Sequence, residues 1–339
     1  AFKKKWIWRL FTFYSKSMRS FITFKELIDD ELNKLTFPSK PSNLYDPIKY
    51  ILSLEAKRMR SIALLLSHHS FNENYNNALP AALAIELFHN FTLIHDDIMD
   101  KAKLRRGEKT VHEKWDNNIA ILSGDTMLVQ SYSLLSELEL NIQANVYKVF
   151  SETATKVCEG QQLDMDFEQI QDLEISEYIE MIQKKTSVLL AASFQIGAII
   201  ANASSEDTLL MYEFGLNLGI AFQLQDDMLD LYGDQSKFGK KIGGDIISNK
   251  KTYLYLKSLS LANFQQEQRL IELFSNSNTN EDKKIVEVKN IFDEVGVLDH
   301  IKDQINYYHN KAQKNLEDLS ITNKNNLIDF AKLLLKREI

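Results

Sequence analysis

Two clusters of aspartates share the pattern DDxxD, and they are the residues of this chain best suited to chemistry. The clusters are Asp96, Asp97 and Asp100 in HDDIMD, and Asp226, Asp227 and Asp230 in QDDMLD. On an α-helix the first and last aspartates of each cluster lie about 40° apart on one face. Such like charges cost a few tenths of a kcal/mol in water, but far more beside an apolar interior. Apolar residues precede both clusters, so the pattern predicts two carboxylate clusters that face each other across a cavity and need a bound cation.

Hard carboxylate oxygens suit Mg²⁺, which also accepts water and phosphate oxygens as ligands. Basic residues stand near both clusters and in the stretch EAKRMR, namely Arg105, Arg106, Lys240, Lys241, Lys250, Lys57, Arg58 and Arg60. We interpret them as ligands for a polyanion held by the metal, and not as partners of the aspartates. The pattern then predicts two anion sites, one bridged by metal and one formed by side chains alone.

The elements that must position these residues are predicted to be helices. Only four prolines and eleven glycines interrupt the 339 residues. Apolar residues recur at spacings of three and four, for example over residues 78–100, where His89 shares a face with Asp96. Gln223 likewise shares a face with Asp226. We find no alternating strand pattern and no nucleotide-binding glycine fingerprint, so we predict one all-α domain of ten or more helices, residues 18–339, around a central cavity.

The most apolar stretch, residues 187–203, is short for a bilayer span and contains polar side chains. We therefore predict a helix that is buried on all sides and no membrane span. Polar segments rich in Gly, Pro, Asn and Ser predict loops at residues 37–47, 68–77, 103–110, 233–245 and 275–284.

Composition narrows the class of protein further. The net charge of −7 and the lack of a helix-turn-helix or zinc-finger spacing argue against a nucleic-acid binder. The single cysteine, Cys158, excludes an intrachain disulfide and fits a reducing compartment, so we predict a cytoplasmic protein with a buried core thiol.

Residues 1–17 are cationic and aromatic and contain no acid. Three interpretations stay open: an amphipathic segment that binds a membrane surface, a signal-like stretch, or a segment upstream of the natural start at Met18.

Taken in order, these motifs resemble those of the trans-isoprenyl diphosphate synthases, the polyprenyl synthetase family. The resemblance spans about residues 57–252. HDDIMD and QLQDDMLD resemble the two aspartate-rich motifs of the family. LRRG, GDTML, EGQQLD and QKKT stand between them in the family's order, and FGKKIGGDIISNKKT resembles its lysine-bearing loop.

The resemblance implies the isoprenoid synthase fold, a homodimer, and the condensation of isopentenyl diphosphate with an allylic diphosphate. It implies three Mg²⁺ ions, which Mn²⁺ could replace, held by Asp96, Asp100 and Asp226 with support from Asp97, Asp164, Asp227 and Asp230. It assigns the allylic diphosphate to Arg105, Lys185 and Lys240, and isopentenyl diphosphate to Lys57, Arg60, His89 and Arg106. Thr186 and Gln223 would direct oxygen dipoles at the reacting carbon, and Gln161, Asp164 and Lys250 would complete the rim.

Some positions depart from the family pattern. Glu55 and Ala56 replace a Gly-Gly pair, and Ser61 replaces a proline. An acid beside an anion site is unfavourable, so we expect Glu55 to face away or to pair with Arg58. Asn249 replaces a glycine, which is a milder change because Asn tolerates left-handed backbone conformations.

The length of the product would be set by the residues one and two turns before Asp96. In the family, an aromatic residue five places before the first motif caps short products, and Phe91 holds that place. On a helical wheel, Phe88 and Thr92 lie closer to the acid face. The small Thr92 favours a C20 product, geranylgeranyl diphosphate, with C15 farnesyl diphosphate next.

Three alternatives are weighed against this function. A terpene cyclase shares the first motif and the all-α fold but normally lacks a second DDxxD and a second basic site. A metal-dependent phosphohydrolase is suggested by the dipeptide His95-Asp96, but it would need more histidine ligands, and His68 and His69 fall in a predicted polar loop. A catalytically weak subunit that binds a partner synthase is kept open by Glu55 and Ala56.

Overall fold

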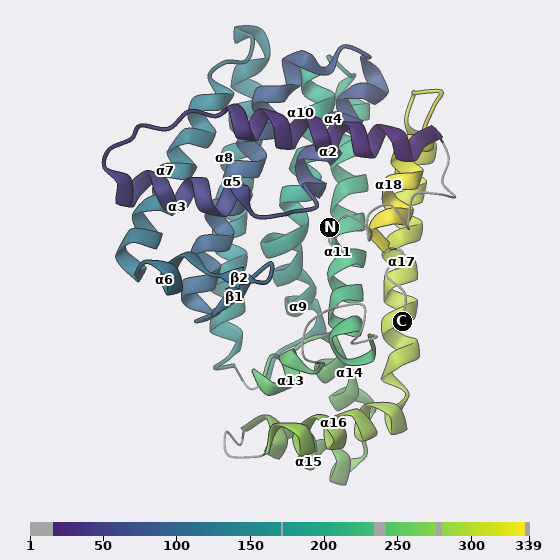
Figure 1. Cartoon of the computed structure of the whole chain (residues 1–339). Helices are drawn as coiled ribbons and strands as arrows, with labels where there is room; N and C mark the ends of the chain where they lie inside the picture. Colours follow the sequence, from purple (N-terminus) through teal and green to yellow (C-terminus); the bar gives the residue numbers. More distant parts are fainter. Residues whose placement is uncertain (1–15, 171, 234–241, 276–279, 336–339) are drawn as a thin grey trace. The chain divides into compact units, whose positions relative to one another are not determined.

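The computed structural model describes residues 16–170, 172–233, 242–275 and 280–335 of the chain. About 80% of the structure is helical, which confirms the predicted all-α fold (Figure 1). The described helices group into two compact units, each discontinuous in sequence, and we describe each unit by itself. The prediction of a single domain stays a prediction, and residues 1–15 lie outside the described part of the chain.

The first unit takes its described residues from Ala1–Glu152, Ala192–Tyr212 and Leu319–Phe330. Its elements are α2 (Lys16–Lys34), α3 (Ser42–Ser53), α4 (Met59–Phe71), the 3-10 turn η1 (Tyr75–Ala78), α5 (Leu79–Met99), β1 (Leu104–Arg105), β2 (Glu108–Lys109), α6 (Val111–Lys114) and α7 (Asn117–Leu135). Parts of α8 (Leu140–Phe167), α10 (Val188–Ile200), α11 (Ser205–Tyr232) and α18 (Asn325–Leu335) complete it.

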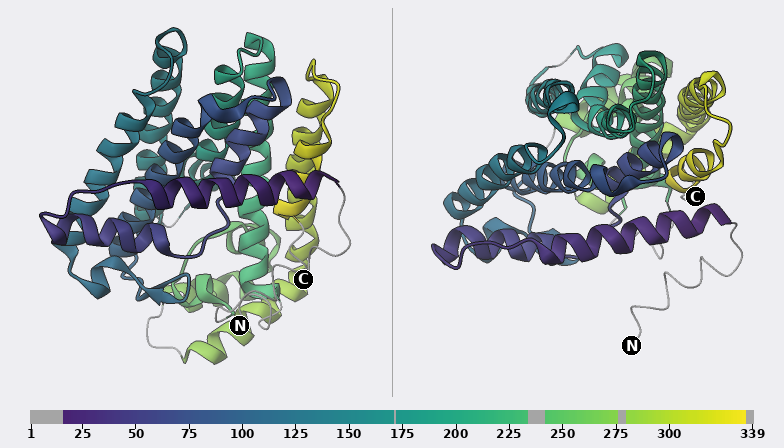
Figure 2. Two further views of the ribbon diagram at one scale, coloured as in Figure 1. Left: turned by 45° about the horizontal axis from the view of Figure 1, so that its top comes forward. Right: turned by 90° about the horizontal axis from the view of Figure 1, so that it is seen from above.

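Helix α5 forms the core of the first unit. It begins with Pro80 in its first turn, where a missing N–H costs nothing, and it is apolar on almost every side. Helices α4 and α7 pack along it, and α2, the purple helix of Figure 2, crosses over α4 and α5. Two glycines permit close approach: Gly124 of α7 leaves room for the His95 ring, and Gly197 of α10 lies against the α4 backbone.

The second unit takes its described residues from Thr153–Ala191, Glu213–Asp318 and Ala331–Ile339. It contains the remainder of α8, α10, α11 and α18 together with α9 (Ile175–Ile182), the π-helical turn η2 (Gln183–Ser187), α13 (Gly244–Ile247), α14 (Tyr253–Leu261), α15 (Phe264–Ser275), α16 (Glu281–Val295) and α17 (Val297–Asp318). Its core is a continuous apolar cluster that includes Leu224 of α11, Leu270 of α15, Val288 of α16 and Ile301 of α17.

Several predicted loops contain helical or strand residues. Residues 42–47 form the start of α3, with Pro47 buried inside the helix. Residues 68–71 continue α4, because His68 is buried and extends its apolar face. Residues 104–109 form the β1–β2 hairpin. Residues 281–284 begin α16, where the Asn280 side chain accepts a hydrogen bond from the Lys283 backbone N–H at 3.1 Å.

Other expectations about burial can now be compared with the structure. Helix α10 is buried on nearly all sides, which confirms the prediction of such a helix, although residues 201–203 follow the helix end and Asn202 is exposed. The prediction of a buried Cys158 is wrong, because the thiol is exposed. On α8 the buried face carries Thr153, Val157 and Gly160, and Cys158 lies one position away from it. Among the described helices, none combines the length and apolar character needed to cross a membrane.

His68 makes the stability of the fold depend on pH. It is fully buried on α4, and within the described residues neither ring nitrogen has a hydrogen-bond partner. Burial lowers the pKa of His68 to about 4, from an ordinary value of about 6.5. Between these values the unfolded chain binds a proton that the folded chain does not bind. This contribution to stability is therefore complete above pH ~6.5 and is lost as the pH falls toward about 4.

We therefore expect the thermal midpoint of the protein to fall by a few degrees between pH 7 and pH 5. In His68→Leu, which cannot titrate at this position, the difference between the two pH values should be smaller. Differential scanning calorimetry of both proteins in matched buffers measures this. An equal pH difference in the two proteins would contradict the role of His68.

Candidate active site

The first aspartate cluster ends helix α5. Asp96 and Asp97 lie in its last turn, and Asp100 is the C-terminal capping residue, whose N–H donates to the Asp96 carbonyl at 2.8 Å. Asp97 is buried, Asp96 is half-buried and Asp100 is exposed. The C-terminal end of a helix carries partial negative charge, so carboxylates are unfavourable there. The position of the cluster on its helix therefore adds to the need for a cation.

Arg105 supplies one such cation directly. Its Nε donates to both Asp97 oxygens at 2.8 and 2.9 Å, and its Nη2 lies 2.7 Å from Asp97 Oδ1 and 3.6 Å from Asp96 Oδ2. Burial raises the pKa of Asp97, although Arg105 opposes that shift. The interpretation that the basic residues are not partners of the aspartates is therefore wrong for Arg105. Its predicted binding of the allylic diphosphate stays a prediction.

The hairpin that carries Arg105 explains why the chain turns back on α5. Arg105 pairs with Glu108, so Arg106 and Gly107 are the two turn residues. Both have positive φ, 55° and 81°, as a type I′ turn requires. This turn is why the motif LRRG contains a glycine. From it, Arg106 Nη1 donates to Asn90 Oδ1 at 3.4 Å, two turns before the aspartates.

A second cationic group lies on the same unit. Arg60 Nη1 lies 3.1 Å from His89 Nε2. Burial, and then the charges of Arg60 and Arg106, lower the pKa of His89 well below its ordinary value, so the neutral ring accepts from Arg60. Burial lowers the pKa of Arg106 to about 10. Predicted residues for isopentenyl diphosphate therefore surround α5 near His89, while Lys57 is exposed at the end of the loop before α4.

The role of Arg58 differs from that of its neighbours in EAKRMR. It is buried, and its Nη1 lies 2.7 Å from Glu86 while its Nε lies 2.9 Å from Asp29. Glu55 is exposed and is not the partner of Arg58 in these contacts. Of the two expectations for Glu55, the structure agrees with the one in which this acid faces away.

The second aspartate cluster lies in the last two turns of α11, in the second unit. Asp227 is buried, whereas Asp226 and Asp230 are half-buried. The Tyr178 hydroxyl of α9 donates to Asp227 Oδ2, and Gln223 Nε2 donates to Asp227 Oδ1 at 3.0 Å. Burial, and then the Asp245 carboxylate, raise the pKa of Asp227 to about 8.

The π-helical turn η2 positions the residues of QKKT against α8 and α11. Lys185 Nζ lies 2.5 Å from Asp164 Oδ2, and Thr186 Oγ1 donates to Gln223 Oε1 at 3.1 Å. π-Helical turns of this kind occur frequently at functional sites. A Cβ at Gly160 would lie 2.2 Å from the Lys185 backbone nitrogen. The glycine of EGQQLD therefore lets α8 approach this turn.

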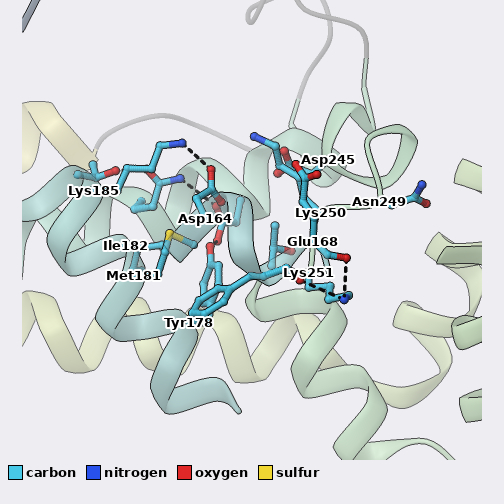
Figure 3. Close-up of a pocket in the computed structure, with 15 residues that line it drawn as sticks. Asp164, Glu168, Tyr178, Met181, Ile182, Lys185, Asp245, Asn249, Lys250 and Lys251 are labelled. Carbon is cyan, nitrogen blue, oxygen red and sulfur yellow. Dashed lines mark hydrogen bonds and ion pairs between the residues drawn. The ribbon is translucent and has the colours of Figure 1, made fainter. Parts of the chain in front are cut away.

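A pocket of about 100 Å³ opens beside these side chains (Figure 3). The residues that line it are Asp164, Phe167, Glu168, Tyr178, Met181, Ile182, Lys185, Thr186, Gln223, Asp227, Asp245, Asn249, Lys250, Lys251 and Thr252. Asp164 and Lys185 are joined at one side of it, and Lys250 and Asp245 lie at the other. The structure thus brings five predicted residues of α8, η2 and α11, together with Lys250, to one cavity that contains both acids and amines.

The segment after α13 closes this pocket. Lys251 Nζ donates to the carbonyls of Phe167 and Glu168 at 3.1 and 3.3 Å and so caps the end of α8. Asn249 has φ of 56°, which agrees with the expectation that Asn tolerates the left-handed conformation. Its Oδ1 accepts a hydrogen bond from the buried Lys284.

The remaining predicted residues are placed as follows. Lys240 and Lys241 lie outside the described residues. Gln161 is half-buried on α8, and Asp230 Oδ2 accepts a hydrogen bond from the Asp245 backbone N–H at 3.0 Å. The two aspartate clusters belong to different units, so their facing each other stays a prediction.

The candidate residues for chain length lie on α5. Phe88 and Phe91 are buried with ring centroids 5.5 Å apart, and Phe88 meets the Phe150 ring at 5.2 Å. Thr92 is half-buried, and its hydroxyl donates to the His89 carbonyl at 2.8 Å.

Sequence reasoning missed several residues of these sites. Glu86 is the one acid within the apolar run of residues 78–94, and that isolation was a usable signal. Tyr178 precedes Lys185 by two helical turns, which is a weaker signal. Nothing local indicated that Asp245 or Lys251 would line the pocket.

The acidic residues fit a divalent cation that also binds a phosphate. Within the described residues, no group of three or more acidic, histidine or cysteine side chains surrounds one point that could hold a metal. Each DDxxD cluster instead offers carboxylates one turn apart at a helix end. Such a donor set suits Mg²⁺, whose other ligands are commonly water and phosphate oxygens.

Comparison with known proteins places this site in a family. Residues 41–293 match the family described as Polyprenyl synthetase. The chain belongs to this family. Its membership confirms the resemblance in the motifs and the predicted class of enzyme, a trans-prenyltransferase, and this family is generally magnesium-dependent.

Individual relatives agree with this membership. The chain is 37% identical to a geranylgeranyl diphosphate synthase of Methanosarcina mazei, over 92% of this chain and 95% of that protein. It is 39% identical to a short chain isoprenyl diphosphate synthase of Methanocaldococcus jannaschii, over 77% of this chain and 80% of that one. A crystal structure of a geranylgeranyl pyrophosphate synthase, 44% identical, superposes with a TM-score of 0.88 and covers 96% of this chain and 100% of that one.

We expect Gly160→Ala to lower both stability and turnover. In an unconstrained helix, Ala is more stable than Gly by about 1 kcal/mol, so a stabilised protein would be the result without the clash. The added Cβ must instead displace the η2 backbone and with it Lys185 and Thr186. Thermal midpoints and steady-state rates of purified proteins measure both effects. Gln162→Ala, at an exposed neighbouring position, is the control and should change neither. A more stable, fully active Gly160→Ala enzyme would contradict the packing argument.

Proposed function

We propose that this prenyltransferase condenses isopentenyl diphosphate with allylic diphosphates to a short-chain trans-prenyl diphosphate. The observation that carries the proposal is that helix α5 positions both a carboxylate cluster and a cationic group of side chains. Asp96 and Asp100 lie at the C-terminal end of α5, where the helix dipole disfavours carboxylates. Two turns earlier, His89 lies beside Arg60 and Arg106. An enzyme that joins two diphosphates requires such a pair.

We further propose that Asp96 and Asp100 of the first unit and Asp226 and Asp230 of the second hold three Mg²⁺ ions, which Mn²⁺ could replace. When bound, these ions would stabilise the charge that develops on the departing diphosphate. Asp97 supports the cluster by holding Arg105, as Asp227 does by holding Gln223. The burial of Asp97 and Asp227 supports these separate roles. The other aspartates of the two clusters are more accessible: Asp96, Asp226 and Asp230 are half-buried, and Asp100 is exposed.

In the proposed reaction, Arg105, Lys185 and Lys240 bind the allylic diphosphate and stabilise it as the C–O bond breaks. Thr186 and Gln223, which are hydrogen-bonded to each other, present oxygen dipoles to the allylic cation. Arg60, His89 and Arg106, with Lys57, hold isopentenyl diphosphate so that its double bond attacks that cation. A proton then leaves the new chain for the departing diphosphate, so no side chain needs to be a strong base.

For the product we propose C20, geranylgeranyl diphosphate, with C15 as the second candidate. Relatives that cover most of this chain carry the name geranylgeranyl diphosphate synthase, and others are named geranylfarnesyl diphosphate synthase. The buried pair Phe88 and Phe91 lies one to two turns before Asp96, where it could form the floor of the chain-elongation cavity.

We also propose that the enzyme is a homodimer. Leu122 and Val129, two turns apart on α7, are 58% and 65% exposed, and Ile121 beside them is 41% exposed. Such an apolar stripe on a helix is suited to burial against a second copy of the chain.

The alternatives are not favoured. A terpene cyclase would not need the Arg60–His89 group, and its relatives do not appear among those described above. A catalytically weak subunit was suggested by Glu55 and Ala56, but Glu55 is exposed and the cationic group is intact. His68 is buried in α4, which removes it as a ligand for a phosphohydrolase metal.

We expect Asp96→Ala and Asp226→Ala each to lower kcat by at least about 100-fold, because each removes a proposed ligand of the Mg²⁺ ions that would stabilise the departing diphosphate. The assay incubates the protein with Mg²⁺, labelled isopentenyl diphosphate and C5, C10 or C15 allylic diphosphates. Circular dichroism should show unchanged helical content. Asp166→Ala, at an exposed acid of α8 outside both clusters, is the control and should keep full activity. Near-normal rates in both cluster variants would overturn the proposed function.

If Phe91 forms the floor of the cavity, Phe91→Ala should yield products longer than those of the unaltered enzyme, because the removed ring opens space behind it. Chromatography of the labelled products after phosphatase treatment measures their length. Phe264→Ala, which removes a ring that is 76% exposed, should leave the product unchanged. A Phe91→Ala enzyme with the original product would show that the floor lies elsewhere.

A further inference from the structure

A cluster of buried polar side chains lies beneath the cationic group of the first unit. Its members are Arg58 at the start of α4, Ser61 one turn later, and Glu86 and Asn90 one turn apart on α5. All four are 5% exposed or less. Ser61, Glu86 and Asn90 are not among the residues predicted to bind substrate, and a buried polar group is costly unless it is hydrogen-bonded.

Glu86 is the centre of this cluster. Its Oε1 accepts from Arg58 Nη1 at 2.7 Å and from Asn90 Nδ2 at 3.1 Å. Its Oε2 accepts from Ser61 Oγ at 2.9 Å. Both carboxylate oxygens are therefore used. Ser61, which replaces the proline of the family pattern, supplies one of these bonds.

The cluster binds two arginines, its own member Arg58 and the neighbouring Arg106, and both have a strained backbone. Arg58 and Arg106 have φ of 53° and 55°, in the left-handed region that residues with a side chain rarely adopt. Such conformations are energetically costly and persist where surrounding contacts determine them. Arg58 is bound directly by Glu86, and Arg106 is bound by Asn90, whose amide is in turn bound by Glu86.

Electrostatics gives Glu86 a second effect. The pKa of Arg106 is lowered to about 10, first by burial and then by the charges of Arg58 and Arg105, and the Glu86 carboxylate is the largest influence that raises it. A buried anion next to crowded guanidinium groups favours their protonated forms. Glu86 is thus placed to keep this group cationic while no diphosphate is bound.

We propose that Glu86 and Asn90 are positioning residues for the homoallylic diphosphate, acting through Arg106 and the segment of Lys57, Arg58 and Arg60. The inference rests on the proposed function, since it concerns the anion site of isopentenyl diphosphate. Glu86 fixes the backbone turn at Arg58, which sets where Lys57 and Arg60 point. Asn90 fixes the guanidinium of Arg106. Neither residue contacts the substrate.

The inference predicts an effect on one substrate alone. In Asn90→Leu, a change of similar volume, KM for isopentenyl diphosphate should rise by about 10-fold, as expected for losing a hydrogen bond to a charged group. KM for the allylic diphosphate and kcat at saturation should stay within about twofold. Steady-state kinetics with each substrate varied in turn measures the three constants on the full-length enzyme.

Two serines of α4 form a matched pair that separates positioning from stability. Ser61 Oγ donates to Glu86, whereas Ser67 Oγ donates to the Phe194 carbonyl at 2.5 Å, outside the cluster. Both are fully buried. Ser61→Ala and Ser67→Ala should both lower the thermal midpoint, but only Ser61→Ala should raise KM for isopentenyl diphosphate, by about 3-fold. This pair decides the question even if Asn90→Leu does not fold.

The outcomes are distinct. A selective rise in KM for isopentenyl diphosphate in Ser61→Ala, or in Asn90→Leu, supports the inference. An unchanged KM in all folded variants, or an equal rise for both substrates, overturns it and leaves the proposed function intact. An unaltered enzyme that forms no prenyl product from any allylic diphosphate contradicts the proposed function itself.

Discussion

The structure depends on how carboxylates are tolerated at the negative ends of helices. Both DDxxD clusters lie at the C-terminal end of a helix, α5 or α11, where like charge and the helix dipole both disfavour them. Within each unit, the central aspartate is satisfied by the protein: Asp97 by Arg105, and Asp227 by Tyr178 and Gln223. The first and last aspartates of each cluster are half-buried or exposed, and two like charges one turn apart still favour a cation beside them.

The glycines of the motifs serve packing and backbone geometry. Gly160 and Gly124 allow two backbones or a backbone and a ring to approach closely, and Gly107 adopts a backbone that other residues avoid. Lys185 and Thr186 are presented by a π-helical turn that Gly160 makes possible. The motif glycines therefore influence the site through packing: Gly124 leaves room for His95, and Gly160 leaves room for the backbone of Lys185.

The helices and the local arrangement of the aspartates could be predicted from the sequence, because both follow from periodicity along a single element. Asp96 and Asp100 share the end of α5 as the 3.6-residue repeat requires. Partnerships between elements could not be predicted. Arg105 was not expected to pair with an aspartate, but the hairpin returns it to Asp97. Arg58 appeared equivalent to Arg60, but it is buried against Glu86. The prediction that Cys158 is buried failed because adjacent positions on α8 differ: Val157 is buried, and Cys158 is exposed.

Departures from a family pattern can then be judged by their contacts and not by their rarity. Glu55 seemed the most damaging of these residues, but an exposed side chain in water is screened and has little influence on a site beyond it. Ser61, by contrast, is buried, and its hydroxyl donates the third hydrogen bond to the buried Glu86 carboxylate. A proline at that position could not donate this hydrogen bond. Glu86 also binds Arg58 directly and binds Asn90, which in turn binds Arg106. A missing hydrogen bond to Glu86 would therefore disturb both arginines, whose backbones lie in the left-handed region.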